Sequence, residues 1–248
     1  MAGRCCTTAA GTRSSSADVL TPTRRRGVEI LDDPAVDAAV RTRSIGDVTR
    51  SNRWLGGLRA AVAELRRILP ALGPDATLLD VGTGLADIPR HGMSAAAAGG
   101  TRLATIGVDV SWPLLSVARG HASHMVCADA RALPFRDGSV DVAMCSQFLH
   151  HFEEGDAEHV VRELDRVARR AVIISDLRRS WIAAAGFWLV SFPLRFHPVT
   201  RHDGVVSVMR GFTAPELTRI VQAATGATAT VSRYPGFRLT ARWMRPTG

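Results

Sequence analysis

The stretch Thr77-Leu-Leu-Asp-Val-Gly-Thr-Gly-Leu-Ala-Asp87 decides how the chain is expected to fold. Its apolar first half is typical of a strand buried inside a sheet. Gly82 and Gly84 permit backbone angles and close approaches that a side chain would prevent, so a tight turn is expected before a helix. Ligands of open α/β sheets bind at the carboxyl ends of the strands, where this turn would lie. The stretch therefore predicts a ligand site.

The residues of this turn favour some classes of ligand over others. In the dinucleotide-binding fingerprint a third glycine stands at the sixth position, but here that position is Asp87, whose carboxylate would lie beside two phosphates. The sequence also lacks the Gly-Lys-Ser/Thr of a phosphate-binding loop. A ligand with a cationic part and no phosphate suits Asp80 and Asp87 better. A tight turn with no ligand is the alternative.

The remainder of the chain alternates between predicted strands and helices. Strands are expected at Thr77–Gly82, Leu103–Asp109, Met125–Ala128, Val140–Cys145 and Ala171–Asp176, and the intervening helices at Ile88–Ala98, Trp112–His121 and Glu153–Arg169. This alternation predicts a parallel, doubly wound α/β sheet. Further on, Thr213–Glu216 has the pattern of a helix capping box. The last two strands, joined across Pro235-Gly236, predict an antiparallel hairpin, with ranges Ala229–Tyr234 and Arg238–Met244.

Asp80-Val-Gly-Thr-Gly84 resembles motif I of the class I S-adenosylmethionine-dependent methyltransferases, with Ala86 at a position where the family often has another glycine. The order of the strands and helices from residue 75 to the C-terminus resembles that family as well. The resemblance implies a mostly parallel, seven-stranded, Rossmann-like sheet with an antiparallel C-terminal hairpin. It also implies a transferase of EC class 2.1.1 with S-adenosyl-L-methionine as its cofactor. Within this class, the chain resembles small-molecule methyltransferases of the methyltransferase-11 type, including those associated with polyketide and quinone pathways.

The resemblance also implies which residues contact the cofactor. They are Asp80, Gly82, Thr83 and Gly84 in the first turn, Asp109 and Val110 after the second strand, Asp129 and Ala130 after the third, and Gln147 after the fourth. Asp109, a strand-end carboxylate 25 residues after Gly84, could accept two hydrogen bonds from a ribose diol. An ordinary solvated aspartate is the alternative. By resemblance, Asp129 accepts a hydrogen bond from the adenine amino group and the Ala130 amide contacts a ring nitrogen.

His150 and His151 are the candidates for a catalytic general base, because imidazole titrates near neutral pH. Adjacent helical residues point about 100° apart, so at most one of the two is expected to face the site. A structural role for both is the alternative. No metal site is expected, because neighbouring histidine side chains should diverge and no third ligand has a suitable spacing.

The sequence outside the alternating region predicts three further segments. Residues 1–26 are expected to be a disordered basic tail, 27–74 an N-terminal helical cap, and 75–248 the methyltransferase domain, with an apolar lid inserted at about 177–210. A helix start is expected at Asp32-Asp33-Pro34, and a break between two helices within Asp47–Gly57. The lid could instead be an ordinary packed helix or a helix on a membrane surface. The candidate substrate contacts are Trp54, Trp181, Phe187 and His202.

Composition limits the possible partners and the compartment. The net charge is +8, but all 31 basic residues are arginine, which suggests a GC-rich coding bias, and about half of the net charge lies in residues 1–26. The four cysteines, at 5, 6, 127 and 145, form no Cys-x-x-Cys pair, and the last two are expected on buried strands, as in a protein of the reducing cytoplasm. No secretory signal is evident, and the uncharged run Ser180–Leu194 is too short to span a bilayer.

Together with the composition, the resemblance thus implies a cytoplasmic methyltransferase of secondary metabolism that acts on a lipophilic small molecule such as a phenol, quinone or polyketide. Nucleic acid is not expected as a partner, whereas contact with a membrane surface is an open possibility. Two alternatives are retained: an RNA methyltransferase, which the basic charge would suit, and a non-catalytic cofactor-binding partner protein.

Overall fold

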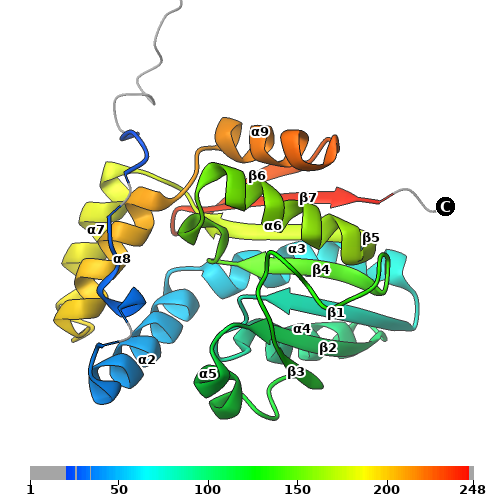
Figure 1. Cartoon of the computed structure of the whole chain (residues 1–248), viewed down its shortest axis with the longest axis horizontal. Coiled ribbons are helices and arrows are strands. Elements are labelled where there is room, and N and C mark those ends of the chain that lie inside the picture. The colour runs from blue at the N-terminus through cyan, green and yellow to red at the C-terminus, as the bar shows by residue number, and fades with distance from the viewer. Residues whose placement is uncertain (1–20, 26, 34, 246–248) are drawn as a thin grey trace, which may run out of the picture.

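A computed structural model describes residues 21–25, 27–33 and 35–245. One sheet runs through the described part of the chain, with the strand order β3-β2-β1-β4-β5-β7-β6 (Figure 1). Strands β1 to β5 are parallel to one another, whereas β7 is antiparallel to both β5 and β6. The predicted α/β sheet with an antiparallel C-terminal hairpin is confirmed. The strands are β1 (Asp75–Val81), β2 (Arg102–Asp109), β3 (His124–Cys127), β4 (Val140–Ser146), β5 (Ala168–Leu177), β6 (Thr230–Tyr234) and β7 (Arg238–Met244).

Helices cover both faces of this sheet (Figure 1). On one face, α3 (Gly57–Leu72) and α4 (Asp87–Ala98) bury Leu65 and Ile68 against the strands. On the other face, α6 (Glu154–Val167) and α9 (Ala214–Thr225) bury side chains such as Leu164. The sheet therefore lies between two apolar layers. Helix α3 is part of one of these layers, although its residues fall within the predicted N-terminal cap.

The remaining helices lie at the carboxyl ends of the parallel strands. They are α2 (Ala38–Trp54), α5 (Trp112–Val117), α7 (Trp181–Ser191), α8 (Pro198–Arg210) and the 3-10 turns η1 (Ile30–Asp32) and η2 (Leu149–His151). Helices α7 and α8 pack against each other, and α2 and η1 both contact α8. In Figure 1, α2, α7 and α8 stand to the left of the sheet. The boundaries predicted for the tail, the cap, the domain and the lid stay predictions.

Local sequence explains where several helices begin. Thr213 and Glu216 form the predicted capping box of α9, since the Thr213 amide donates to Glu216 Oε2 at 2.7 Å and the Glu216 amide donates to Thr213 Oγ1 at 3.4 Å. The start expected at Asp32-Asp33-Pro34 is wrong. Asp32 ends the short turn η1, and α2 begins at Ala38, because Asp37 accepts hydrogen bonds from the first free amides of that helix.

Three further expectations are refined or contradicted by the structure. The break expected within Asp47–Gly57 is confined to Leu55 and Gly56, because α2 continues to Trp54. The helix expected over Trp112–His121 ends at Val117. Cys127, which was expected to be buried, is exposed because it lies on the edge strand β3.

Residues 1–20 and 26 of the predicted tail, with Cys5 and Cys6, lie outside the described residues. Within residues 21–25, the Pro22 carbonyl accepts a hydrogen bond from Arg179 and the Arg24 side chain donates to the Phe152 carbonyl.

The register of the sheet brings four strand ends together. Val81 at the end of β1 pairs with Val108 of β2 and with Cys145 of β4. Ser146 at the end of β4 pairs with Ser175 of β5. Polar residues just beyond these strand ends therefore meet at one edge of the sheet, beneath α2, α7 and α8.

Candidate functional site

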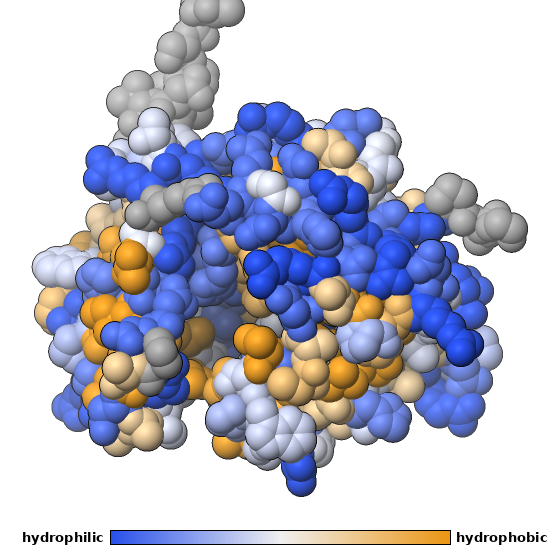
Figure 2. Space-filling model, viewed as in Figure 1, coloured by the Kyte–Doolittle hydropathy of each residue, from blue (hydrophilic) through white to orange (hydrophobic). Residues whose placement is uncertain are grey.

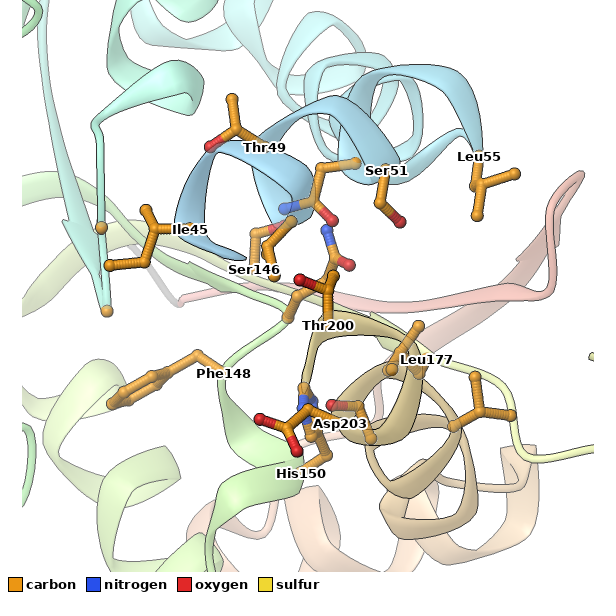
Figure 3. A pocket seen from close by; sticks show the side chains of 18 of the residues that line it. Ile45, Thr49, Ser51, Leu55, Ser146, Phe148, His150, Leu177, Thr200 and Asp203 are labelled. Carbon is orange, nitrogen blue, oxygen red and sulfur yellow. The ribbon is translucent and has the colours of Figure 1, made fainter. Parts of the chain in front are cut away.

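A cavity of about 580 Å³ opens at this edge of the sheet. Figure 2 shows the hollow in the surface, with hydrophobic residues on its rim. The turns after β1, β2 and β4 form one side, whereas α2, α7 and α8 form the other. In Figure 3 the side chains of Ile45 and Thr49 on α2 lie across the cavity from Thr200 and Asp203 on α8. The cavity is large enough to hold a nucleoside-sized ligand together with a second small molecule.

The turn after β1 has the close-packed backbone that its two glycines predict. Gly82 and Gly84 have φ angles of 71° and 51°, and the amides of Gly82 and Thr83 donate to the Val108 carbonyl at 2.8 and 2.9 Å. A Cβ on Gly82 would come within 2.2 Å of the Phe148 ring. Any side chain at residue 82 would therefore displace this ring from the cavity wall.

Asp80 is a buried carboxylate with one free oxygen. Its side chain is almost completely buried, and Oδ2 accepts a hydrogen bond from Thr83 Oγ1 at 2.7 Å. Within the described part of the chain, Asp80 Oδ1 and Ser146 Oγ are buried without a hydrogen-bond partner, although both residues line the cavity. Burial raises the pKa of Asp80 to about 7, and the negative charge of Asp109 adds to this effect. A cationic ligand group in the cavity could donate a hydrogen bond to Asp80 Oδ1.

Asp109 lies at the end of β2, where its carboxylate is fixed by the backbone. Its Oδ2 accepts a hydrogen bond from the Gly84 amide at 3.0 Å, and its Oδ1 accepts one from the Ser111 amide at 2.9 Å. The residue lines the cavity. Since each carboxylate oxygen can accept a further hydrogen bond, Asp109 is positioned to bind a diol.

The structure does not bring Val110, Asp129 and Ala130 into this cavity. Val110 is exposed, Ala130 is buried, and Asp129 lies on the surface in a two-oxygen ion pair with Arg131 at 2.7 to 3.2 Å. Hydrogen bonding to Arg131 lowers the pKa of Asp129. Asp129 nevertheless follows β3, the strand beside the one that ends at Asp109. The Ala128 amide donates to the Asp109 carbonyl at 3.2 Å. The adenine contacts assigned to Asp129 and Ala130 stay predictions.

Gln147 and Arg238 form a polar contact at the end of β4. Gln147 has a φ of 51°, which a non-glycine residue rarely adopts, and its amide donates to the Ser175 carbonyl at 2.7 Å. Its Oε1 accepts a hydrogen bond from Arg238 Nη1 at 3.0 Å, while Arg238 Nε donates to the Leu55 carbonyl at 3.2 Å. Burial lowers the pKa of Arg238 to about 10. Arg238 therefore links the antiparallel strand β7 to the cavity wall.

His150 and His151 both line the cavity, so the expectation that at most one would face it is wrong. Their ring centroids are 4.3 Å apart at an interplanar angle of 32°, because the 3-10 turn η2 brings the two rings together. Buried Asp176 holds His150, since its Oδ1 lies 2.7 Å from His150 Nδ1 and its Oδ2 accepts a hydrogen bond from the His150 amide at 3.1 Å. Removal from bulk water and the neighbouring His150 lower the pKa of His151.

The other side of the cavity is largely apolar. Of the four predicted substrate contacts, Phe187 lines the cavity. Trp54, Trp181 and His202 do not, and each is substantially exposed. His202 lies inside α8. The apolar lining residues of this side include Ile45, Val48, Leu55, Leu58, Leu177, Ile182, Phe187 and Val190.

Several polar lining residues were missed by the sequence reasoning, among them Glu29, Asp203 and Arg238. Glu29 is buried, and its Oε1 accepts hydrogen bonds from Ser207 at 2.8 Å and Arg210 at 3.0 Å. Asp203 accepts hydrogen bonds from the amides of η1, and Arg238 contacts Gln147 as described. Glu29 and Asp203 lie outside the alternating strand–helix region, and nothing in their local sequence pattern marks them. Arg238 could have been found, because an arginine at the start of an apolar strand is unusual.

Comparison with known proteins identifies the class of this site. A family model described as a methyltransferase domain matches residues 79–174. The sequence matches no curated protein. Residues 79–174 therefore match a methyltransferase domain, and the resemblance predicted from motif I is confirmed over that part of the chain.

Solved structures with the same fold are distant in sequence. A methyltransferase dependent on S-adenosylmethionine from Archaeoglobus fulgidus is 13% identical, with a TM-score of 0.55 over 80% of this chain and 99% of that one. Another from Thermotoga maritima, described as a possible histamine N-methyltransferase, is 16% identical, with a TM-score of 0.52 over 83% and 99%. Magnesium protoporphyrin IX methyltransferase from Synechocystis PCC 6803, crystallised with SAH, is 15% identical, with a TM-score of 0.52 over 86% and 90%.

These relationships establish the fold as that of the class I methyltransferases. S-adenosylmethionine is the methyl donor of this class, so the predicted cofactor is confirmed together with the fold. Identities of 13 to 16% carry no information about the methyl acceptor.

Proposed function

We propose that the protein transfers a methyl group from S-adenosylmethionine to a lipophilic small molecule, such as a phenol, quinone or polyketide. The observation that carries this proposal is a single cavity with two chemically different sides. The ends of β1 and β2 supply the carboxylates of Asp80 and Asp109, whereas α7 supplies mainly apolar side chains and α2 adds Ile45 and Val48. A polar nucleoside and an apolar acceptor would fit these two sides.

The residues at the polar side suit the cofactor. Asp80 Oδ1 and Ser146 Oγ are buried acceptors without a partner, which the ammonium of the methionine moiety would satisfy. Asp109, held by the Gly84 and Ser111 amides, is oriented to accept hydrogen bonds from the ribose hydroxyls. We assign the backbone of Gly82, Thr83 and Gly84 to the same ligand. The cofactor supplies an activated methyl group, so the protein mainly has to position the acceptor and exclude water.

His150 is our candidate for the catalytic base. Asp176 engages Nδ1 at 2.7 Å, which leaves Nε2 to accept a proton from an acceptor hydroxyl. The buried carboxylate would also stabilise the imidazolium that results. His151 is a weaker candidate, because its lowered pKa disfavours the protonated form.

Helix α7 supports a further part of the proposal, contact with a membrane surface. It is apolar on all sides, yet Trp188, Leu189 and Phe192 at its C-terminal end are each about half exposed. Arg201 lies over the Phe192 ring at 3.7 Å, as cationic and aromatic side chains do at lipid headgroups. Among the described residues, no helix is long and apolar enough to cross a bilayer. A cytoplasmic location and a role in secondary metabolism stay predictions from the sequence.

The proposal is tested by two measurements on the full chain. Calorimetry should show binding of S-adenosylmethionine, and incubation with labelled cofactor should transfer label to alkylphenols or hydroquinones. Polar phenols of similar acidity serve as matched acceptors, and transfer to them should be weaker. Absence of cofactor binding would refute the assignment, while cofactor binding with label transferred only to RNA would overturn the acceptor class.

A further inference from the structure

Glu29, His150 and His151 form a cluster of potential metal ligands in the wall of the cavity. One ligand atom from each of these residues lies within 4.8 Å of the other two. His151 Nδ1 is 3.9 Å from Glu29 Oε2. Two ligand atoms bound to one ion at about 2.1 Å lie at most about 4.2 Å apart. The ligand atoms of the three residues would therefore have to move together by roughly 1 Å to bind one ion.

Neighbouring groups orient two of these three ligands. Asp176 engages His150 at Nδ1, so Nε2 is the nitrogen left for an ion. Ser207 and Arg210 bind Glu29 at Oε1, so Oε2 is the oxygen left. A carboxylate behind a ligating histidine, and hydrogen bonds behind a ligating carboxylate, are the outer contacts that metal sites use to fix their ligands. The orientation of both groups is therefore already set.

The charges around the cluster do not exclude a dication. Glu29 and Asp176 carry negative charge, and Asp203 also lines the cavity. Arg210 opposes a cation, since its Nη1 lies 3.0 Å from Glu29 Oε1. However, Arg210 also pairs with Asp32 at 3.5 Å and donates to the Gly27 carbonyl, so its charge is shared with other partners.

We propose that Glu29, His150 and His151 bind one transition-metal dication, such as Zn²⁺ or Fe²⁺, at the acceptor side of the cavity. Two imidazoles and one carboxylate favour these ions over Mg²⁺ and Ca²⁺, which prefer oxygen ligands. Three protein ligands leave coordination positions open toward the cavity. The expectation that neighbouring histidines diverge is wrong here, because η2 turns both rings to the same side.

A metal ion at this site would also restrict the chemical class of the methyl acceptor. This extension rests on the proposed function. A hydroxyl bound to the ion has a lowered pKa, so its proton leaves to water and its oxygen is held as an oxyanion near the cofactor. His150 is then a ligand, and the ion replaces it in activating the acceptor. The acceptor class would be molecules with a hydroxyl able to coordinate a metal, such as catechols or hydroxyquinones.

Metal binding can be tested without any acceptor. The full chain, freed of metal with a chelator, is titrated with Co²⁺ and followed by its visible absorption and by equilibrium dialysis. One ion per chain is expected, with the bands of a nitrogen and oxygen ligand set. His151→Ala and Glu29→Gln should abolish these bands, and Asp176→Asn should weaken affinity about 10- to 100-fold. His159→Ala, an exposed histidine on α6, is the matched control.

Calorimetry with S-adenosylmethionine on each variant shows that it is folded and tests the proposed function separately. Failure to bind Co²⁺ at one ion per chain, or unchanged bands in His151→Ala, would overturn the metal site while leaving the methyltransferase assignment intact. Co²⁺ binding in a chain that does not bind the cofactor would support the site and refute the proposed function.

Discussion

The raised pKa of Asp80 predicts that cofactor affinity depends on pH. Burial raises this pKa to about 7, so the side chain is mostly protonated in weakly acidic solution. The ammonium of S-adenosylmethionine should bind the ionised carboxylate far better than the neutral acid. Below pH 7 the cofactor must therefore bind the small ionised fraction of the protein.

The size of the effect follows from that pKa. With a value of about 7, roughly a quarter of Asp80 is ionised at pH 6.5 and roughly 3% at pH 5.5. Affinity should thus fall about eightfold over this interval, or about 1.2 kcal/mol. The interval lies below the pKa of the cofactor's own α-amino group, at about 8, so the ligand keeps its charge throughout.

Isothermal titration calorimetry of the wild type and of Asp80→Asn at both pH values measures this change. The variant should bind more weakly at pH 6.5 and should lose most of the eightfold dependence. Repeating the titration in two buffers of different ionisation enthalpy should reveal proton release by the wild type alone. Equal pH dependence in the two proteins, or a flat profile in the wild type, would refute the reasoning.

Stability should change with pH for the same reason and in a defined direction. Between about pH 4 and pH 7 the folded protein keeps a proton on Asp80 that the unfolded chain has already lost. Unfolding free energy should therefore fall as pH rises through this window, by up to about 4 kcal/mol from this residue. Denaturant unfolding of the wild type against Asp80→Asn, without cofactor, isolates that contribution.

Three further substitutions test other parts of the site. Asp109→Ala should weaken cofactor binding by at least about 1.5 kcal/mol through loss of charge-assisted hydrogen bonds, and unchanged calorimetric affinity would contradict the ribose assignment. Phe187→Ser should raise KM for an apolar acceptor several-fold while sparing cofactor affinity, whereas Trp181→Ser, which lies off the cavity, should change KM little. If His150 is the base, Asp176→Asn should lower kcat while sparing cofactor affinity, and an unchanged kcat would argue against that role.

Most of the sheet could be predicted because its signals are local. Apolar runs, the glycines after β1 and the capping box of α9 each determine a nearby backbone conformation, so strand ends were misplaced by only a few residues. The start of α2 was misplaced because Asp32 and Asp37 both precede helical sequence, and a tertiary contact decides between them. Asp203 binds the amides of Ile30 and Leu31 and holds that segment in a separate turn.

The site was only partly predictable. Some of its residues lie at strand ends, whereas others reach the cavity through contacts between segments that are distant in sequence. Asp80, Gly82 and Asp109 lie at strand ends, where the topology alone places them at the cavity. Glu29 reaches the cavity through contacts with α8 that span about 180 residues of sequence, and no local pattern encodes such a distance. The convergence of His150 and His151 was missed because a 3-10 turn was not anticipated.

Different segments of the chain form the two sides of the cavity, which affects how proteins of this kind can change their methyl acceptor. The side that we propose for the cofactor lies within residues 79–174, the segment that the family model matches, whereas α2, α7, α8 and Arg238 lie outside it. Exchange of α7 and α8 between two such proteins would leave the strand ends of β1, β2 and β4 in place. A chimaera built at residues 178 and 211 should therefore inherit acceptor preference from the inserted pair of helices and donor use from the host.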